Sequence, residues 1–179
     1  MDCAERDQAA RAAHAEAAAA QHDEHLGWGA PTVDRIVDVD EANDALLWPL
    51  VTQYGWLGSH LVGADGAHAC WLLAQHAPRH HRATYLQFMI EAVAGGNASA
   101  TDLAYLHDRV SVDRYRPQAF GTQYLAVFSN PPRLWPIENG VNIRRAAARL
   151  PPLSTENLAA IWTPGDLRRI RIITRARCC

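Results

Sequence analysis

The clearest hydrophobic pattern in the chain lies between residues 65 and 77. There Ala69, Leu72, Leu73 and His76 recur at the i, i+3, i+4 and i+7 spacing of one helix face. The pattern predicts a central helix over 65–77. A histidine completes the otherwise apolar stripe that this helix is expected to bury.

Further helices are predicted on both sides of this segment. Residues 4–25 are alanine-rich and favour a helix, but they include no large apolar residue, so we expect a peripheral or partly frayed helix. Apolar residues at helical spacing predict the remaining helices over residues 40–53, 82–94, 102–110, 141–150 and 154–162.

The helix over 40–53 contains two special positions. Asp40 is expected to cap its first turn, and Pro49 predicts a kink or an early end. Its apolar face is expected to comprise Leu46, Leu47, Leu50 and Val51.

A small β-hairpin is predicted in the C-terminal third. Residues 124–128 are the best strand candidate, and 134–137 are expected to form its partner after a proline-rich turn. The fold class is therefore mainly α, a single compact helical domain with a small β-hairpin. We expect an alanine-rich N-terminal helix or frayed extension over 1–30, a helical core over 31–162 and a basic C-terminal tail over 163–179.

Composition narrows the class of protein. The chain has 179 residues, 49% of them hydrophobic, and a formal net charge of -2, which predicts a soluble globular protein with no nucleic-acid or membrane partner. The arginines near the C-terminus are interpreted as part of a loosely ordered tail rather than a nucleic-acid-binding arm. No signal peptide or membrane-spanning run is visible, so a cytoplasmic location is expected. The sequence leaves the oligomeric state open.

The same composition removes several chemistries. All 17 basic residues are arginine, so Schiff-base and lysine general-base mechanisms are excluded. The phosphate-binding loop, the dinucleotide-binding glycine pattern, the nucleophile elbow and the HExxH zinc motif are all missing from the sequence. His22, Asp23 and His25 are interpreted as a solvated helix end rather than a metal site. We therefore expect neither a metal nor a cofactor.

His76 is the leading candidate for chemistry. An imidazole titrates near neutrality, and a polar partner in a buried place would make it a general acid or base. Amides that could meet it are those of Asn43, Gln118 and Gln123. The alternative is a core histidine whose nitrogens are both satisfied by hydrogen bonds. The sequence leaves both open.

Other candidate positions also have two interpretations. Gln118, Thr122 and Gln123 surround a glycine in an irregular segment, where amides bind a polar ligand or satisfy the loop backbone. Trp56 and Trp71 suit pocket walls, although core packing is the commoner role of tryptophan. On the helix over 102–110, Tyr105 is a further candidate for binding, and Arg109 suits an anion clamp or an internal ion pair.

A family resemblance rests on five blocks of sequence. These blocks are YGW at 54–56, LVGADGAHACWLLAQHA at 61–77, DLAYLHDRV at 102–110, PQAFGTQY at 117–124 and PIENGVNIRRAAARLPPL at 136–153. Their order and spacing over about residues 35–160 resemble a bacterial, often actinobacterial, family known only as a domain of unknown function. The resemblance implies a small, mostly helical cytoplasmic protein and no particular reaction.

Two positions depart from the pattern of that family. Leu57 stands where a proline usually follows the YGW block, and Pro78 stands where an aspartate usually follows the QHA block. If the aspartate orients the histidine in relatives, the resemblance implies a specialised or weakened activity here.

The sequence favours a small, cofactor-free enzyme that carries out acid–base chemistry on a small polar molecule, as an isomerase, cyclase, lyase or hydrolase, in a bacterial biosynthetic pathway. In this hypothesis His76 and Gln123 are catalytic, and the other residues named above form the binding site: Gln118, Thr122, Trp56, Trp71, Asn43, Tyr105 and Arg109. Two alternatives remain, a ligand- or protein-binding helical module without chemistry, and a structural domain that contacts a partner through its arginine-rich C-terminal face.

Overall fold

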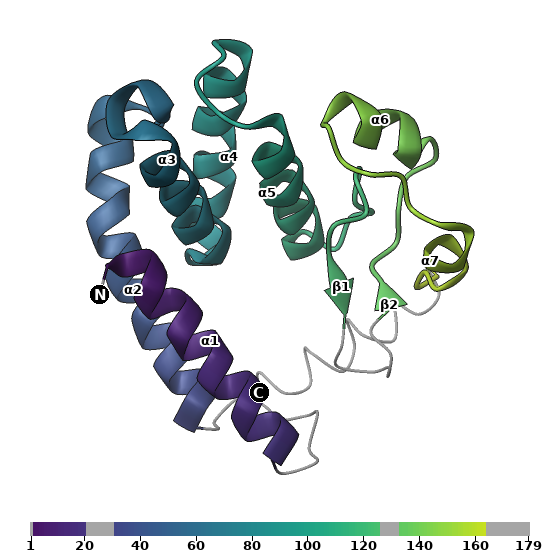
Figure 1. Ribbon diagram of the computed structural model, residues 1–179, viewed down its shortest axis with the longest axis horizontal. Helices are drawn as coiled ribbons and strands as arrows, with labels where there is room; N and C mark the ends of the chain where they lie inside the picture. Colours follow the sequence, from purple (N-terminus) through teal and green to yellow (C-terminus); the bar gives the residue numbers. More distant parts are fainter. Residues whose placement is uncertain (1, 21–30, 126–132, 164–179) are drawn as a thin grey trace. The chain divides into compact units, whose positions relative to one another are not determined.

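The computed structural model describes residues 2–20, 31–125 and 133–163, and it is mainly α, as the sequence predicts (Figure 1). The described helices are α1 (Cys3–Ala20), α2 (Pro31–Tyr54), α3 (Ser59–His76), α4 (Arg79–Ala94), α5 (Ala100–Asp113), α6 (Val141–Ala147) and α7 (Thr155–Ala159). Two short strands, β1 (Tyr124–Leu125) and β2 (Arg133–Leu134), pair antiparallel.

The chain divides into two compact units, residues 1–106 and 107–179. The division falls inside α5 and therefore differs from the boundaries expected at residues 30 and 162. The N-terminal helix α1 belongs to the first unit, together with α2, α3, α4 and the first half of α5.

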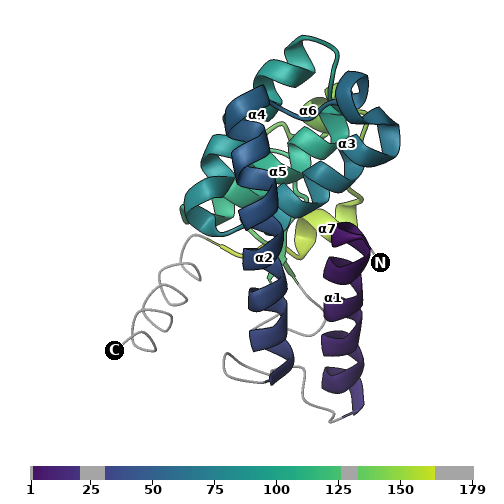
Figure 2. The same cartoon turned by 90° about the vertical axis from the view of Figure 1, so that its left-hand side faces the viewer.

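Helices α1 and α2 lie side by side (Figure 2). The side-chain amide of Asn43 on α2 donates to the carbonyl of Cys3 on α1 at 3.4 Å. Asp7 and Ala10 of α1 are buried, so this helix packs on the core through small and polar side chains. Helix α2 begins at Pro31, and proline is favoured in the first turn of a helix. The prediction that Asp40 is an N-cap is therefore wrong, because Asp40 lies in the interior of α2.

Helix α2 buries only part of the face expected from its sequence. Leu47 and Val51 are buried in the core, whereas Leu46 is 57% and Leu50 is 44% exposed. The helix also continues past Pro49 to Tyr54 rather than ending early. Four leucines and valines in six residues cover more than one helix face, and the packing of the neighbouring helices decides which face is buried.

Helix α3 buries a different face from the predicted one. Its buried residues are Ala74 and Gln75, while the stripe that ends at His76 is half-buried. The helix starts at Ser59 and is interrupted at Gly63, whose φ of 72° is left-handed, so the chain before residue 64 follows another axis. Helix α4 agrees better with its predicted stripe, since Tyr85 and Met89 are almost fully buried.

Gly58 lies against the loop that follows α4. A Cβ atom built on Gly58 would lie 2.2 Å from the carbonyl oxygen of Asn97, and the neighbouring amide of Ser59 donates to that same oxygen at 3.2 Å. Only glycine lets the two backbones approach this closely.

The second unit contains the hairpin and the two short C-terminal helices. Tyr124 pairs with Leu134, and the amide of Trp162 donates to the carbonyl of Leu134 at 2.9 Å. Leu134, Val141 and Leu153 form the apolar core of this unit. Helix α6 ends before its predicted limit, and Arg149 adopts a left-handed φ of 59° beyond it.

Serine side chains cap two of the described helices. The Ser99 hydroxyl accepts a hydrogen bond from the amide of Asp102 at the start of α5, and the Ser154 hydroxyl accepts one from the amide of Asn157 at the start of α7. Helix α7 ends at Ala159 rather than 162.

Some expectations concern residues outside the described ranges, namely the interpretation of His22, Asp23 and His25, most of the C-terminal tail and the end of the first strand. Among the described helices, none has the length and apolar composition needed to cross a membrane.

We predict that Gly58→Ala destabilises the protein by about 1–3 kcal/mol, because the added methyl group must push apart two backbone segments. Chemical denaturation measures the loss. Gly95→Ala is the matched control, since a Cβ there meets no atom closer than 3.5 Å. Equal stability of the two variants would contradict this account of Gly58.

Candidate functional site

His76 lies at the C-terminal end of α3 and contacts a buried carboxylate. Its Nδ1 atom lies 3.0 Å from both carboxylate oxygens of Asp7 on α1. The Asp7 side chain is 1% exposed and the His76 side chain 16%. In the described part of the chain, no hydrogen-bond partner is found for Nε2 of His76. The pair therefore anchors one side of the imidazole and leaves the other nitrogen available.

Arg11 joins this pair to α2. Its Nη2 atom lies 3.0 Å from an Asp7 oxygen and 2.5 Å from an oxygen of Asp40, and its Nε lies 3.1 Å from Nδ1 of His76. One guanidinium thus contacts side chains from three helices.

The contacts of Nδ1 allow two arrangements of the imidazole proton. A carboxylate only accepts hydrogen bonds, so bonding to Asp7 requires a hydrogen on Nδ1 and leaves a lone pair on Nε2 of the neutral ring. Arg11 only donates, so a bond from its Nε requires a bare Nδ1 and places the hydrogen on Nε2. The cluster can therefore hold the neutral ring of His76 with either a lone pair or a hydrogen at Nε2.

The two carboxyl groups of the cluster have opposite pKa shifts. Burial alone would raise the pKa of Asp7, but the hydrogen bonds and charges of His76 and Arg11 outweigh it and hold the pKa well below its usual value. Burial raises the pKa of Asp40, which Arg11 only partly offsets. Neighbouring carboxyl groups with separated pKa values are typical of sites that move protons.

Asp7, Asp40 and His76 also have the donor set of a metal site. One ligand atom from each lies within 4.8 Å of the others. The guanidinium of Arg11, however, bonds to both carboxylates and already supplies a positive charge there. A metal ion at this place would have to displace Arg11.

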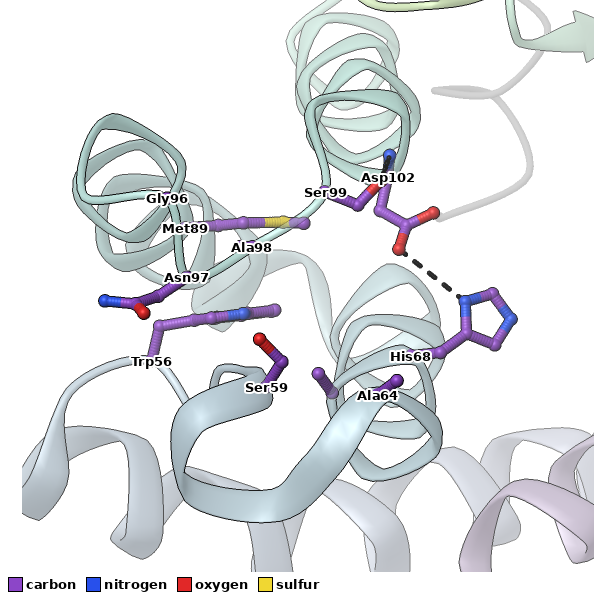
Figure 3. A pocket seen from close by; sticks show the side chains of 11 residues that line it. Trp56, Ser59, Ala64, His68, Met89, Gly96, Asn97, Ala98, Ser99 and Asp102 are labelled. Carbon is purple, nitrogen blue, oxygen red and sulfur yellow. Dashed lines mark hydrogen bonds and ion pairs between the residues drawn. The ribbon is translucent and has the colours of Figure 1, made fainter.

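A separate pocket in the first unit contains Trp56. Its volume is about 260 Å³. Trp56 and Met89 lie on one side of it, and Asp102 and His68 on the other (Figure 3). The glycine-containing turn around Gly58 and the loop after α4 bring these side chains together. Trp56 lines this pocket and is also a buried core residue, so both interpretations of this tryptophan stay open.

Asp102 gives the pocket its charge. Its carboxylate lies 3.6 Å from Nδ1 of His68, and burial raises its pKa above the usual value despite this histidine. Trp71 is not among the lining residues, but its ring packs 4.9 Å from that of His68 and edge-on against Tyr105 at 6.0 Å. Three of the predicted binding residues therefore gather near Asp102 and His68.

The predicted glutamine loop lies in the second unit, where Gln118 is fully buried. Its amide nitrogen donates to the carbonyls of Gln123 and Trp135 at 3.0 and 2.8 Å. Its amide oxygen accepts from the backbone amides of Thr122 and Gln123 at 2.9 and 2.8 Å. These bonds use the whole hydrogen-bonding capacity of the side chain, which favours the loop-supporting interpretation of Gln118.

The remaining backbone of this loop is bonded by charged side chains. Asp108, which is fully buried, accepts hydrogen bonds from the amides of Ala119, Phe120 and Thr122. Arg144 and Arg145 donate to the loop carbonyls of Ala119 and Phe120, each at 2.7 Å.

The other predicted residues of the second unit also have defined places. The Thr122 hydroxyl donates to Asp108 at 3.0 Å and accepts from the side-chain amide of Gln123, also at 3.0 Å. Arg109 is half-buried on α5. His76 and Asn43 belong to the first unit, so the sites named from the sequence fall into two groups.

The sequence interpretation missed Asp7 and Arg11. They stand four residues apart, the spacing at which opposite charges meet on a helix, and this signal was present in the sequence. It did not indicate that His76 would be their partner, because that contact joins residues 69 positions apart.

The comparisons with known proteins now identify the family. The sequence profile of a family of unknown function, DUF6624, matches residues 3–160. The chain belongs to this family. The match includes α1, and with it Asp7 and Arg11, which lie before the region of the resemblance noted from the sequence. No curated protein and no solved structure matches the chain.

We predict that Asp7→Asn destabilises the protein at neutral pH by about 2 kcal/mol or more, because the change leaves buried partners without their counter-charge. The native pKa of Asp7 is depressed, so its contribution is present above the unfolded pKa of about 3.9 and is lost as pH falls below it. The stability gap between wild type and variant should narrow as pH falls below about 4. Urea denaturation across this range measures the gap. Asp38→Asn, at an exposed position of α2, is the control. If the stability difference between wild type and Asp7→Asn did not change with pH, the lowered pKa of Asp7 would be contradicted.

We predict that Gln118→Leu costs about 2 kcal/mol or more, since it leaves the buried amide of Gln123 and the buried carbonyl of Trp135 without their partner. Thermal or urea unfolding measures the change. Gln87→Leu, at an exposed position of α4, should change stability by no more than about 0.5 kcal/mol. A Gln118 variant as stable as the Gln87 variant would show that this amide does not support the loop.

Proposed function

We propose that this chain is a small enzyme that carries out acid–base chemistry on a small polar molecule, without a cofactor. The proposal rests on one observation. The buried Asp7 carboxylate is hydrogen-bonded to Nδ1 of His76, and Nε2 of the same ring has no partner among the described residues. Reactions of the isomerase, cyclase, lyase or hydrolase type all need such a group.

Asp7 orients the imidazole and stabilises it when it accepts a proton. A carboxylate at Nδ1 fixes which ring nitrogen faces a substrate, and its negative charge favours the imidazolium that forms. The family pattern usually has an aspartate where this chain has Pro78, and its loss suggested weakened activity. Asp7 supplies a carboxylate from α1 instead, so Pro78 does not by itself argue against a competent histidine.

Asp40 and Arg11 support the same role. The raised pKa of Asp40 makes it the carboxyl group of the cluster that takes up a proton more readily. Arg11 bonds to both Asp7 and Asp40 and offsets part of their charge, which weakens the repulsion between two carboxylates that lie near the histidine.

The catalytic role expected for Gln123 and the substrate-orienting role of Gln118 are not part of this proposal. Gln118 uses its side chain on the loop, and Gln123 lies in the second unit with its own side-chain amide bonded to Thr122. The acid–base proposal therefore depends on the first unit alone.

The alternative, a binding module without chemistry, is supported by the pocket that contains Trp56. This pocket is lined by polar and apolar groups suited to a small ligand, and His76 is not among its lining residues. A ligand held there would meet Asp102 and His68 rather than the cluster around His76.

We predict that the wild-type protein converts at least one compound in a panel of small polar metabolites and that His76→Gln lowers that rate by about 100-fold or more, as expected for loss of a general acid–base group. Time-resolved proton NMR of the mixtures measures conversion. His60→Gln, at an exposed position on α3, should retain the wild-type rate.

Two results would count against the enzyme. Conversion at equal rates by wild type and His76→Gln would remove His76 from the mechanism. Binding of a compound without conversion, unchanged by His76→Gln, would favour the binding module.

A further inference from the structure

A second carboxylate–imidazole pair lies at the start of α4, and neither the sequence nor the proposed function assigns it a role. Nδ1 of His81 lies 2.7 Å from one oxygen of Asp44 on α2, and the hydroxyl of Tyr85 donates to the other oxygen at 2.8 Å. Asp44 is only 6% exposed. Burial, together with this hydrogen bond, raises the pKa of Tyr85, so the hydroxyl stays a donor to Asp44.

The imidazole of His81 is held in place on a further side. Its ring stacks on that of Trp48 with a centroid distance of 3.6 Å and an angle of 4° between the planes. The side chain is 22% exposed, and no partner of its Nε2 atom is found in the described part of the chain. Because Asp44 accepts from Nδ1, the neutral ring presents a lone pair at Nε2.

A hollow of about 350 Å³ lies over this pair, between α2 and the start of α4. This volume falls at the lower end of the range for small-molecule sites. Its lining residues come from one face of α2 and from the α3–α4 turn, and they are Glu41, Asp44, Ala45, Trp48, Pro49, Pro78, His80 and His81.

The polar groups at the hollow mostly accept hydrogen bonds. Glu41 is exposed, and its carboxylate has no partner in the part of the chain that the structure describes. Pro49 has no N–H, so the helical donor to the carbonyl of Ala45 is missing at a point where both residues line the hollow. Together with Nε2 of His81, these groups are hydrogen-bond acceptors, so they favour a ligand that donates hydrogen bonds.

The charge of the lining points to a cation. Two carboxylates and no arginine line the hollow, and the chain contains no lysine. The apolar part of the lining, formed by Trp48 and the two prolines, suits a compact hydrocarbon body next to the charged group.

We propose that this hollow binds a small primary amine. The ammonium group lies against Glu41 and Nε2 of His81, and an aromatic or branched apolar body packs on Trp48 and Pro49. The proposal stands whether or not His76 moves a proton, because none of its residues belongs to the cluster around His76.

Three probes of equal size test the charge requirement: 2-phenylethylamine, 2-phenylethanol and phenylacetate. The titration is run at about pH 8, where the amine is protonated. NMR titration should show saturable binding of the amine, with the alcohol and the acid at least about tenfold weaker, which corresponds to about 1.4 kcal/mol. Equal binding of all three probes, or no saturation by the amine at about 10 mM, would overturn the proposal.

Two pairs of variants locate the site. Glu41→Gln should weaken amine binding about three- to fivefold, as expected for loss of an exposed ion pair, and should leave the affinity for the alcohol unchanged. The control Glu16→Gln, on α1, should change neither affinity. Ala45→Leu should fill the hollow and abolish amine binding, while Ala42→Leu, exposed on α2 but outside the lining, should not. Unchanged amine affinity in Glu41→Gln and Ala45→Leu would show that the amine binds elsewhere, and the assignment would be wrong.

Discussion

The arrangement of the polar residues in the first unit depends on the guanidinium of Arg11. It bonds to Asp7 within α1, to Asp40 on α2 and to Nδ1 of His76 on α3. Without a positive charge at this point, Asp7 and Asp40 would lie near each other with only a histidine to offset them. The separated pKa values of the two carboxyl groups follow from this geometry, since Asp7 also has the hydrogen bond of His76 and Asp40 does not.

In the second unit, charged and amide side chains allow an irregular loop to be buried. Backbone groups that leave water must find partners, and a loop has no ladder or helix to supply them. Here Asp108 and Gln118 accept hydrogen bonds from the amides of residues 119, 120, 122 and 123, and Arg144 and Arg145 donate to loop carbonyls. The buried charges in this unit therefore have a structural role, and their presence does not indicate a catalytic site.

Local signals in the sequence predicted most elements of the fold. Helical spacing predicted α4 and α5, because this pattern depends on residues within one or two turns. Burial was predicted less well. Leu46 and Leu50 follow the same pattern as Leu47 and Val51, and only the packing of neighbouring helices exposes the first two.

The candidate site shows the same limit. The sequence indicated His76 but not its carboxylate, because Asp7 lies on a helix with no apolar stripe to suggest that it is packed. Gln118 was recognised as a residue with two possible roles, and the choice between them required the positions of the backbone groups around it. Trp56 was expected in a pocket and lies in one, but the turn at Gly58 that places it there gives no helical or strand pattern.

The way α1 is attached has a consequence for motion. Up to residue 17 this helix buries only Asp7 and Ala10, so its docking relies on the charge network more than on apolar area. A segment with few buried apolar contacts opens more easily than the global fold. Any opening of α1 would remove Asp7 and Arg11 from His76 in one step. The histidine site is thus assembled only while this helix is docked, and the lifetime of the site cannot exceed the lifetime of the docked helix.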